Sequence, residues 1–159
     1  MQSEKPRLII LGAGNISIYL TTLAARYGFD VTVIDNNPAY AVADKFPQAK
    51  SVLCREFAGC MDDLNIGADD YIAVLTRGHT YDPVCLLELM KFDEPRYVGV
   101  IGNKRRVAEM LDSIVPKGFS KERRGKLNTP IGFWIGSSTP DEIALSIIAE
   151  IVGRKNGVL

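Results

Sequence analysis

The apolar positions of the chain change spacing repeatedly, and their order predicts strands that alternate with helices. Leu8 to Leu11 is a short unbroken apolar run, as expected of a strand that is buried on both faces. Apolar residues then recur at helical spacing up to Tyr27, and a second apolar run ends on Asp35. Further strands are expected at Ser51 to Leu53, Tyr71 to Leu75 and Tyr97 to Ile101. We therefore predict an α/β fold, a Rossmann-like doubly wound parallel sheet forming a single domain over residues 1–159, with a flexible leader at 1–6.

The segments between these strands predict helices. Pro38 to Phe46 and Glu56 to Leu64 are each expected to form one, and Asp82 is expected to cap another with Pro83 in its first turn. Asn103 can cap a further helix. Thr139 to Glu142 has the pattern of a capping box, and the helix behind it carries a strong apolar stripe. We expect this last helix to pack on the sheet, or partly on a partner subunit.

The turn after the first strand has the pattern of a dinucleotide-binding loop. Gly12 permits a tight turn, and Gly14 lets the N–H groups of Asn15 and Ile16 approach a pyrophosphate at the positive end of a helix. Asp35 stands about twenty residues further on, where an acid can accept hydrogen bonds from a ribose. Its charge would repel a 2′-phosphate, which favours NAD-like or adenosine ligands over NADP. The alternatives are an empty site and, for Asp35, a cap or turn former.

Two further loops carry cations to the same predicted sheet edge. Arg77 and His79 follow one strand, with Gly78 between them, and Lys104 and Arg105 open the helix after another. Cations in the first turn of a helix oppose its dipole, which makes sense if a phosphate or another anion lies over that turn. We predict that these four residues line one anion pocket beside the glycine turn. The alternatives are a solvated basic face and a histidine with a purely structural hydrogen bond.

Composition excludes several other classes of function. The chain has 19 basic and 19 acidic residues in 159, so nucleic acid is not expected as a partner. No apolar stretch approaches the ~20 residues that a bilayer span requires, so no membrane association is expected. His79 is the only histidine, and the three cysteines lack metal-ligand spacing, so we expect no metal site. Reduced thiols and the absence of a secretory signal predict a cytoplasmic protein.

The later motifs resemble one family. They are Thr76 to His79 with Tyr81 and Asp82, then Tyr97 to Arg106, then Pro130 to Gly136 leading to Thr139 to Ala144. Taken in this order they resemble the Rossmann domain of the xanthine dehydrogenase accessory factor family (XdhC/CoxI type), whose members usually carry an additional amino-terminal domain. The resemblance implies binding of the molybdenum cofactor (molybdopterin or its dinucleotide form), help with its sulfuration, and delivery to a molybdenum hydroxylase such as xanthine dehydrogenase.

Three functions of different class remain open on the sequence. The first is a non-catalytic accessory protein that binds a nucleotide or the molybdenum cofactor and works with a molybdenum hydroxylase. Its expected further partners are a cysteine desulfurase and a second copy of the chain, in a homodimer. The second is an NAD-dependent oxidoreductase, for which the Rossmann unit leaves little chain to hold a second substrate. The third is a nucleotide-sensing regulatory domain. We expect no catalytic residue in the first case.

Overall fold

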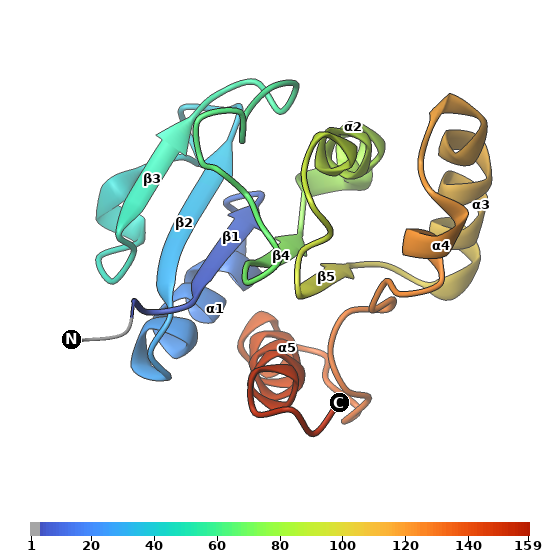
Figure 1. Cartoon of the computed structure of the whole chain (residues 1–159). Helices are drawn as coiled ribbons and strands as arrows, with labels where there is room; N and C mark the ends of the chain where they lie inside the picture. The colour runs from blue at the N-terminus through green and yellow to red at the C-terminus, as the bar shows by residue number, and fades with distance from the viewer. Residues whose placement is uncertain (1–3) are drawn as a thin grey trace.

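A computed structural model describes residues 4–159, and five parallel strands form the centre of the molecule (Figure 1). The strands lie in the order β3-β2-β1-β4-β5, so the chain winds outward from β1 in both directions. Their bounds are β1 (Arg7–Leu11), β2 (Asp30–Asp35), β3 (Ser51–Cys54), β4 (Tyr71–Val74) and β5 (Tyr97–Val100). The predicted doubly wound α/β fold is confirmed. The predicted leader lies partly outside the described residues.

Helices cover both faces of this sheet. They are α1 (Asn15–Arg26), α2 (Asp82–Glu88), α3 (Lys104–Ile114), the short α4 (Lys121–Arg124) and α5 (Pro140–Lys155). Successive residues of β1 point to opposite faces, because the side-chain period of a strand is two. Leu8 and Ile10 lie in a core with α1 and α5, whereas Ile9 and Leu11 lie in a second core with α2 and α3. Every residue of this strand from Leu8 onward is therefore apolar.

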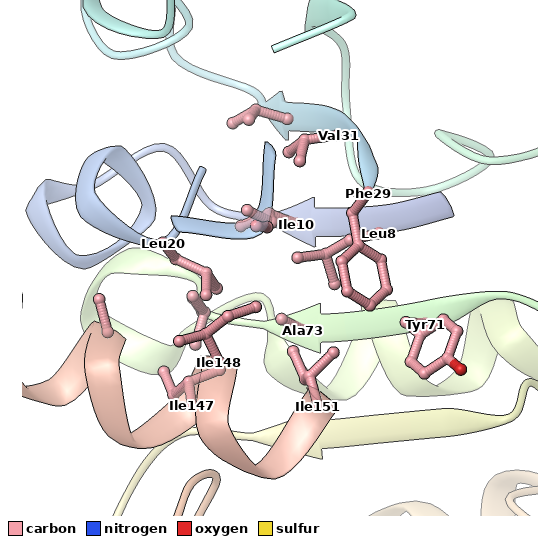
Figure 2. Close-up of a cluster of buried hydrophobic side chains, with 14 of the residues drawn as sticks. Leu8, Ile10, Leu20, Phe29, Val31, Tyr71, Ala73, Ile147, Ile148 and Ile151 are labelled. Atoms are coloured by element: carbon pink, nitrogen blue, oxygen red, sulfur yellow. The ribbon is translucent and has the colours of Figure 1, made fainter. Parts of the chain in front are cut away.

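The core beneath α1 and α5 explains the apolar stripe of the last helix. Figure 2 shows Ile147, Ile148 and Ile151 of α5 beside Ala73 of β4 and Leu20 of α1. The α5 helix begins with the predicted capping box: Thr139 accepts from the backbone of Glu142, and the Glu142 side chain accepts from the backbone of Thr139. The expectation that this helix packs on the sheet is thus confirmed.

Two predicted helices are wrong. Within Pro38 to Phe46 only Ala43–Lys45 forms a 3₁₀ turn, because Asn37 Oδ1 accepts from Ala39 N–H at 2.9 Å and starts an Asx turn instead. Glu56 to Leu64 forms successive turns without a helix. Gly59 lies there at φ +74°, a left-handed conformation that interrupts a helix.

The role predicted for Asp82 as a cap is also wrong. Asp82 is the first residue of α2, and Tyr81 stands at the cap position without a side-chain hydrogen bond. The carboxylate of Asp82 turns instead to Thr76 and His79. By contrast Asn103 caps α3 as predicted, since its Oδ1 accepts from Arg106 N–H at 2.8 Å. Among residues 4–159, no helix has the length and apolar character needed to cross a bilayer.

Candidate functional site

The glycine turn joins β1 to α1 at the carboxyl edge of the sheet. Gly12 has φ +116°, and a Cβ at this position would overlap the backbone carbonyl of Leu75 in the neighbouring chain segment. Gly14 is different: its φ is −84°, and a Cβ there would meet only the side chain of Arg77, at 3.5 Å. Gly12 is therefore required by the fold, whereas Gly14 keeps a space open in front of the helix.

Ser17 stands where a dinucleotide-binding Gly-x-Gly-x-x-Gly loop has its third glycine. Its hydroxyl donates to the carbonyl oxygen of Gly12 at 2.5 Å, and the residue is buried. The serine thus ties the first turn of α1 to the glycine loop. No side chain caps the amino end of α1, so its first N–H groups face outward as donors.

Asp35 lies directly below this turn, at the carboxyl end of β2. Its Oδ2 accepts from Ala13 N–H at 2.9 Å, and its Oδ1 accepts from Asn37 N–H at 3.0 Å. Only 1% of the residue is exposed. These bonds correspond to the alternative role of Asp35 as a turn former, which the sequence left open. To accept a hydrogen bond from a ribose, Asp35 would have to use a carboxylate that already accepts from two backbone N–H groups.

Arg77 covers the remaining side of that carboxylate. Its Nε lies 3.2 Å from Oδ2 of Asp35, its Nη2 lies 3.0 Å from Oδ1, and the guanidinium stacks 3.6 Å from the ring centroid of Tyr40. Burial alone would raise the pKa of Asp35, but the hydrogen bonds from Arg77, Ala13 and Asn37 outweigh it and lower the pKa below its ordinary value. Asp35 is thus held as a carboxylate.

A second acidic network lies behind the next loop. Asp82 is fully buried, accepts from the hydroxyl of Thr76, and has Oδ2 3.2 Å from Nδ1 of His79. Arg106 Nη2 lies 3.7 Å from the same oxygen and also donates to the carbonyl of Ile101 at 2.7 Å. Burial raises the pKa of Asp82, and the bonds from Thr76 and His79 oppose this rise. The network fixes the imidazole at the pocket edge.

The backbone beneath His79 is held in an unusual conformation. Gly78 and His79 have φ values of +68° and +63°, in the left-handed region that side chains with a Cβ rarely adopt. Non-glycine residues persist in this region where the surrounding contacts over-determine them, and such positions cluster at ligand sites. The bond from His79 to Asp82 is one such contact.

These elements enclose a pocket of about 330 Å³ in front of the first turn of α1. It is lined by Gly14, Asn15, Ile16, Ser17, Leu75, Thr76, Arg77, His79, Ile101 and Pro140. Of the predicted anion-pocket residues the structure thus brings Arg77 and His79 together with the glycine turn. Gly12 and Asp35 support the turn from behind.

Lys104 and Arg105 do not line this pocket. Both are exposed at the start of α3, and Arg105 Nε lies 3.2 Å from Oε1 of Glu109 one turn along the same helix. Arg106, the next residue along the helix, is the cation that turns inward. The sequence patterns did not identify Thr76, Asp82 or Arg106 as site residues. An acid three residues after the histidine was the signal in the sequence for Asp82.

The donor set of the pocket suits an anion that carries an apolar or planar body. The N–H groups of the α1 first turn, the guanidinium of Arg77 and the imidazole of His79 are donors, and no described lining residue has a carboxylate. Ile16, Leu75, Ile101 and Pro140 form the apolar part of the wall. Among residues 4–159, no group of three or more His, Cys, Asp or Glu side chains is placed to hold a metal ion.

The chain matches a known protein family over most of its length. A family model described as the XdhC Rossmann domain matches residues 8–151, which is most of the chain. This chain belongs to the XdhC Rossmann-domain family. The resemblance that the motifs suggested, to xanthine dehydrogenase accessory factors, is confirmed.

Three longer proteins are similar to the chain. YqeB of Escherichia coli K12 is 30% identical over 154 residues, which cover 96% of this chain and 28% of YqeB. A Bacillus subtilis 168 protein named as a probable component of xanthine dehydrogenase is 30% identical over 154 residues, covering 97% of this chain and 44% of that protein. A solved structure named as a xanthine dehydrogenase of Bacillus halodurans superposes with a TM-score of 0.83 at 30% identity, over 96% of this chain and 43% of that one. This XdhC domain therefore spans less than half the length of these relatives.

Proposed function

We propose that this XdhC domain binds a phosphate-bearing cofactor at the glycine turn and serves as an accessory protein to a molybdenum hydroxylase of the xanthine dehydrogenase type. The observation that carries the proposal is the pocket in front of α1. There the uncapped amino end of the helix lies beside Arg77 and His79, and Gly14 has no side chain to fill the space. A phosphate bound there would satisfy the outward N–H groups and would be balanced by the guanidinium.

The residues present fit either of two ligand classes. A dinucleotide such as NAD carries a pyrophosphate, and the molybdenum cofactor carries a phosphate on a pterin, or a pyrophosphate in its dinucleotide form. The pocket volume of about 330 Å³ lies near the lower end of the range of ligand sites. It would thus take the phosphate and an adjacent part of such a ligand, with the rest extending past the pocket mouth.

The chain's own residues would hold and release the ligand. The N–H groups after Gly14 and the side chains of Arg77 and His79 would bind the phosphate, while Asp82 and Arg106 would keep the imidazole oriented. The bound molybdenum cofactor supplies oxygen-transfer and redox chemistry to the hydroxylase that receives it. Delivery to a hydroxylase, contact with a cysteine desulfurase and assembly as a homodimer belong to the same proposal.

A turnover assay and a capture experiment test the accessory role against an oxidoreductase. We expect the purified chain to show no sustained oxidation of NADH or reduction of NAD with small alcohols, acids or aldehydes. We also expect a tagged chain to retain a molybdenum hydroxylase or a cysteine desulfurase from an extract of its own organism. Robust NAD(H) turnover, or capture of neither protein, would contradict the accessory role.

A further inference from the structure

A second cavity, also of about 330 Å³, lies on the outer side of β5, the edge strand. We call it the basic pocket. Its walls come from the segment before β5, from the region of α4 and from the end of α5; the lining includes Arg96, Val98, Phe119, Arg123, Lys126 and Arg154. Figure 1 shows α4 beyond β5, on the side away from β4. The lining residues of the basic pocket and of the glycine-turn pocket have no member in common.

The basic pocket collects an excess of positive charge. Four cationic side chains line it, and Glu94 is the acidic residue among its lining residues. Lys126 Nζ lies 3.5 Å from Glu94 Oε2 and 3.6 Å from Glu122 Oε1, so this one cation has carboxylate partners. Within residues 4–159, no carboxylate lies within 4 Å of the three arginine guanidiniums. The charge inside the cavity therefore exceeds what its own acid balances.

The arginines are held in place by neutral oxygens. Arg123 donates to the carbonyls of Leu89 at 3.0 Å and Phe92 at 2.8 Å. Arg96 donates to the carbonyls of Arg154 and Lys155 at the end of α5, at 3.4 and 3.2 Å. These bonds fix the side chains without neutralising them, and each guanidinium has five N–H donors, of which the bonds use only some.

Arg154 shows the same deficit of acceptors. It donates to the carbonyl of Arg96 at 3.4 Å and to Oδ1 of Asn128 at 3.3 Å. Its Nε is buried without a hydrogen-bond partner among the described residues. A buried donor without an acceptor is costly, and a slight turn of the guanidinium toward the cavity would offer it to an oxygen of a ligand.

Hydrogen bonds to backbone carbonyls account for the position of each arginine separately. They do not account for the presence of three arginines at one cavity. Like charges held together repel, and a bound anion reverses that repulsion. Leu89, Val98, Phe119 and Leu127 add an apolar wall beside the charges. Arginine forks match phosphate oxygens in geometry, and a surplus of three positive charges favours a dianion over a single carboxylate.

We propose that the basic pocket binds a small phosphate monoester whose body is apolar or aromatic. The phosphate would lie against Arg123, Arg154 and Lys126, and the apolar body against Val98 and Phe119. This site is separate from the glycine turn, so phosphate monoester binding here does not depend on cofactor binding there.

Titration of the whole chain with phenyl phosphate, followed by ¹H–¹⁵N spectra, tests the site. We expect the largest shifts at Phe119, Leu127 and Asn128, and weaker binding of both inorganic phosphate and benzoate. Lys126→Glu should weaken phenyl phosphate by about tenfold or more, because it reverses one charge at the cavity. Lys121→Glu is the matched control, since it makes the same charge change on α4 at a residue that does not line the cavity.

Three results would overturn the proposal. They are no shift at those amides at millimolar phenyl phosphate, equal weakening by Lys121→Glu and Lys126→Glu, and benzoate or inorganic phosphate binding as tightly as phenyl phosphate. The Gly14→Val variant should leave phenyl phosphate binding unchanged. Loss of this binding in Gly14→Val would place the phosphate at the glycine turn and would likewise contradict a separate site.

Discussion

The guanidinium of Arg77 lies against the carboxylate of Asp35 as a two-pronged ion pair, with Nη2 3.0 Å from Oδ1 and Nε 3.2 Å from Oδ2. The two residues are far apart in the chain: Asp35 ends β2, and Arg77 lies in the loop after β4. The strand β1 with its glycine turn lies between β2 and β4. The pair therefore lies where the ribose and phosphates of a dinucleotide are expected to meet. Arg77 therefore both covers the carboxylate of Asp35 and lines the pocket in front of α1.

Removal of this pair should make the protein less stable at neutral pH and its stability less dependent on pH in acid. Because the folded state lowers the pKa of Asp35, the pair stabilises the protein above the ordinary carboxylate range and loses this contribution as pH falls through the lowered pKa. Arg77→Ala should cost about 1–2 kcal/mol at neutral pH, since Arg77 is partly exposed and solvent screens the pair.

Urea unfolding followed by circular dichroism from pH 3 to pH 7 measures both effects. The difference in the free energy of unfolding between wild type and Arg77→Ala should be largest near pH 7 and should shrink towards pH 3, because the wild type loses the contribution of the pair as Asp35 becomes protonated. Arg105→Ala is the control, since its side chain is 90% exposed. A difference between wild type and Arg77→Ala that stays constant from pH 7 to pH 3 would show that the pair does not set the pKa of Asp35.

Alanine at the two glycines of the turn should change the stability of the fold by very different amounts. Gly12→Ala should destabilise the fold by more than about 3 kcal/mol, because the new Cβ has φ +116° and overlaps the carbonyl of Leu75. Gly14→Ala should stay within about 1 kcal/mol of the wild type, because its backbone conformation suits alanine. Thermal unfolding of both variants is the measurement, and similar losses in the two would contradict this division of roles.

The strained backbone at His79 predicts an order of stability. His79→Ala and His79→Gly both remove the bond to Asp82, but only alanine keeps a Cβ at φ +63°. The glycine variant should therefore be more stable than the alanine variant by about 1 kcal/mol. Asn65, at φ +51° and outside this network, provides a second glycine and alanine pair for comparison. If alanine equals glycine at position 79 but not at position 65, the strain at His79 is not real.

The three thiols should differ in reactivity. Cys54 is exposed, whereas Cys60 and Cys85 are buried, and none forms a disulfide. Burial raises the pKa of Cys60 to about 11 and raises the pKa of Cys85 as well, so both stay protonated and slow to react near neutral pH. Titration with a thiol reagent should detect one fast thiol in the native protein and three in denaturant. Three fast native thiols would contradict the burial of the other two.

Local sequence patterns predicted the strands, the glycine turn and the caps of α3 and α5, but not the start of α2. The apolar run of β1, the Asn103 cap and the Thr139 capping box each depend on residues within a few positions of one another, so the sequence alone contains the information. The failures at Pro38 to Phe46 and Glu56 to Leu64 arose where an Asx turn and a left-handed glycine outweighed weak helical spacing.

The hydrogen bonds and ion pairs of the site were less predictable, because they join segments that are distant in the sequence. Nothing local to Asp35 indicates that Arg77 will cover it, and nothing local to Arg105 shows that its neighbour Arg106 is the cation that turns inward. The spacing of His79 and Asp82 allowed either a helix cap or an ion pair, and only the packing of Thr76 beside Asp82 decides between them. The expected preference for NAD over NADP stays a prediction.

Native mass spectrometry of the freshly purified chain tests the central claim most directly. Wild type, Gly14→Val and Gly67→Val should be produced in parallel in a host that makes NAD and the molybdenum cofactor. Valine at Gly14 places a branched side chain in the open space before α1, whereas at Gly67 a new Cβ meets no atom within 4 Å and the glycine turn is untouched. We predict a phosphate-containing adduct on wild type and on Gly67→Val, with its occupancy reduced about tenfold or more in Gly14→Val. No such adduct on the wild type, or the same occupancy in Gly14→Val, would contradict cofactor binding at the glycine turn.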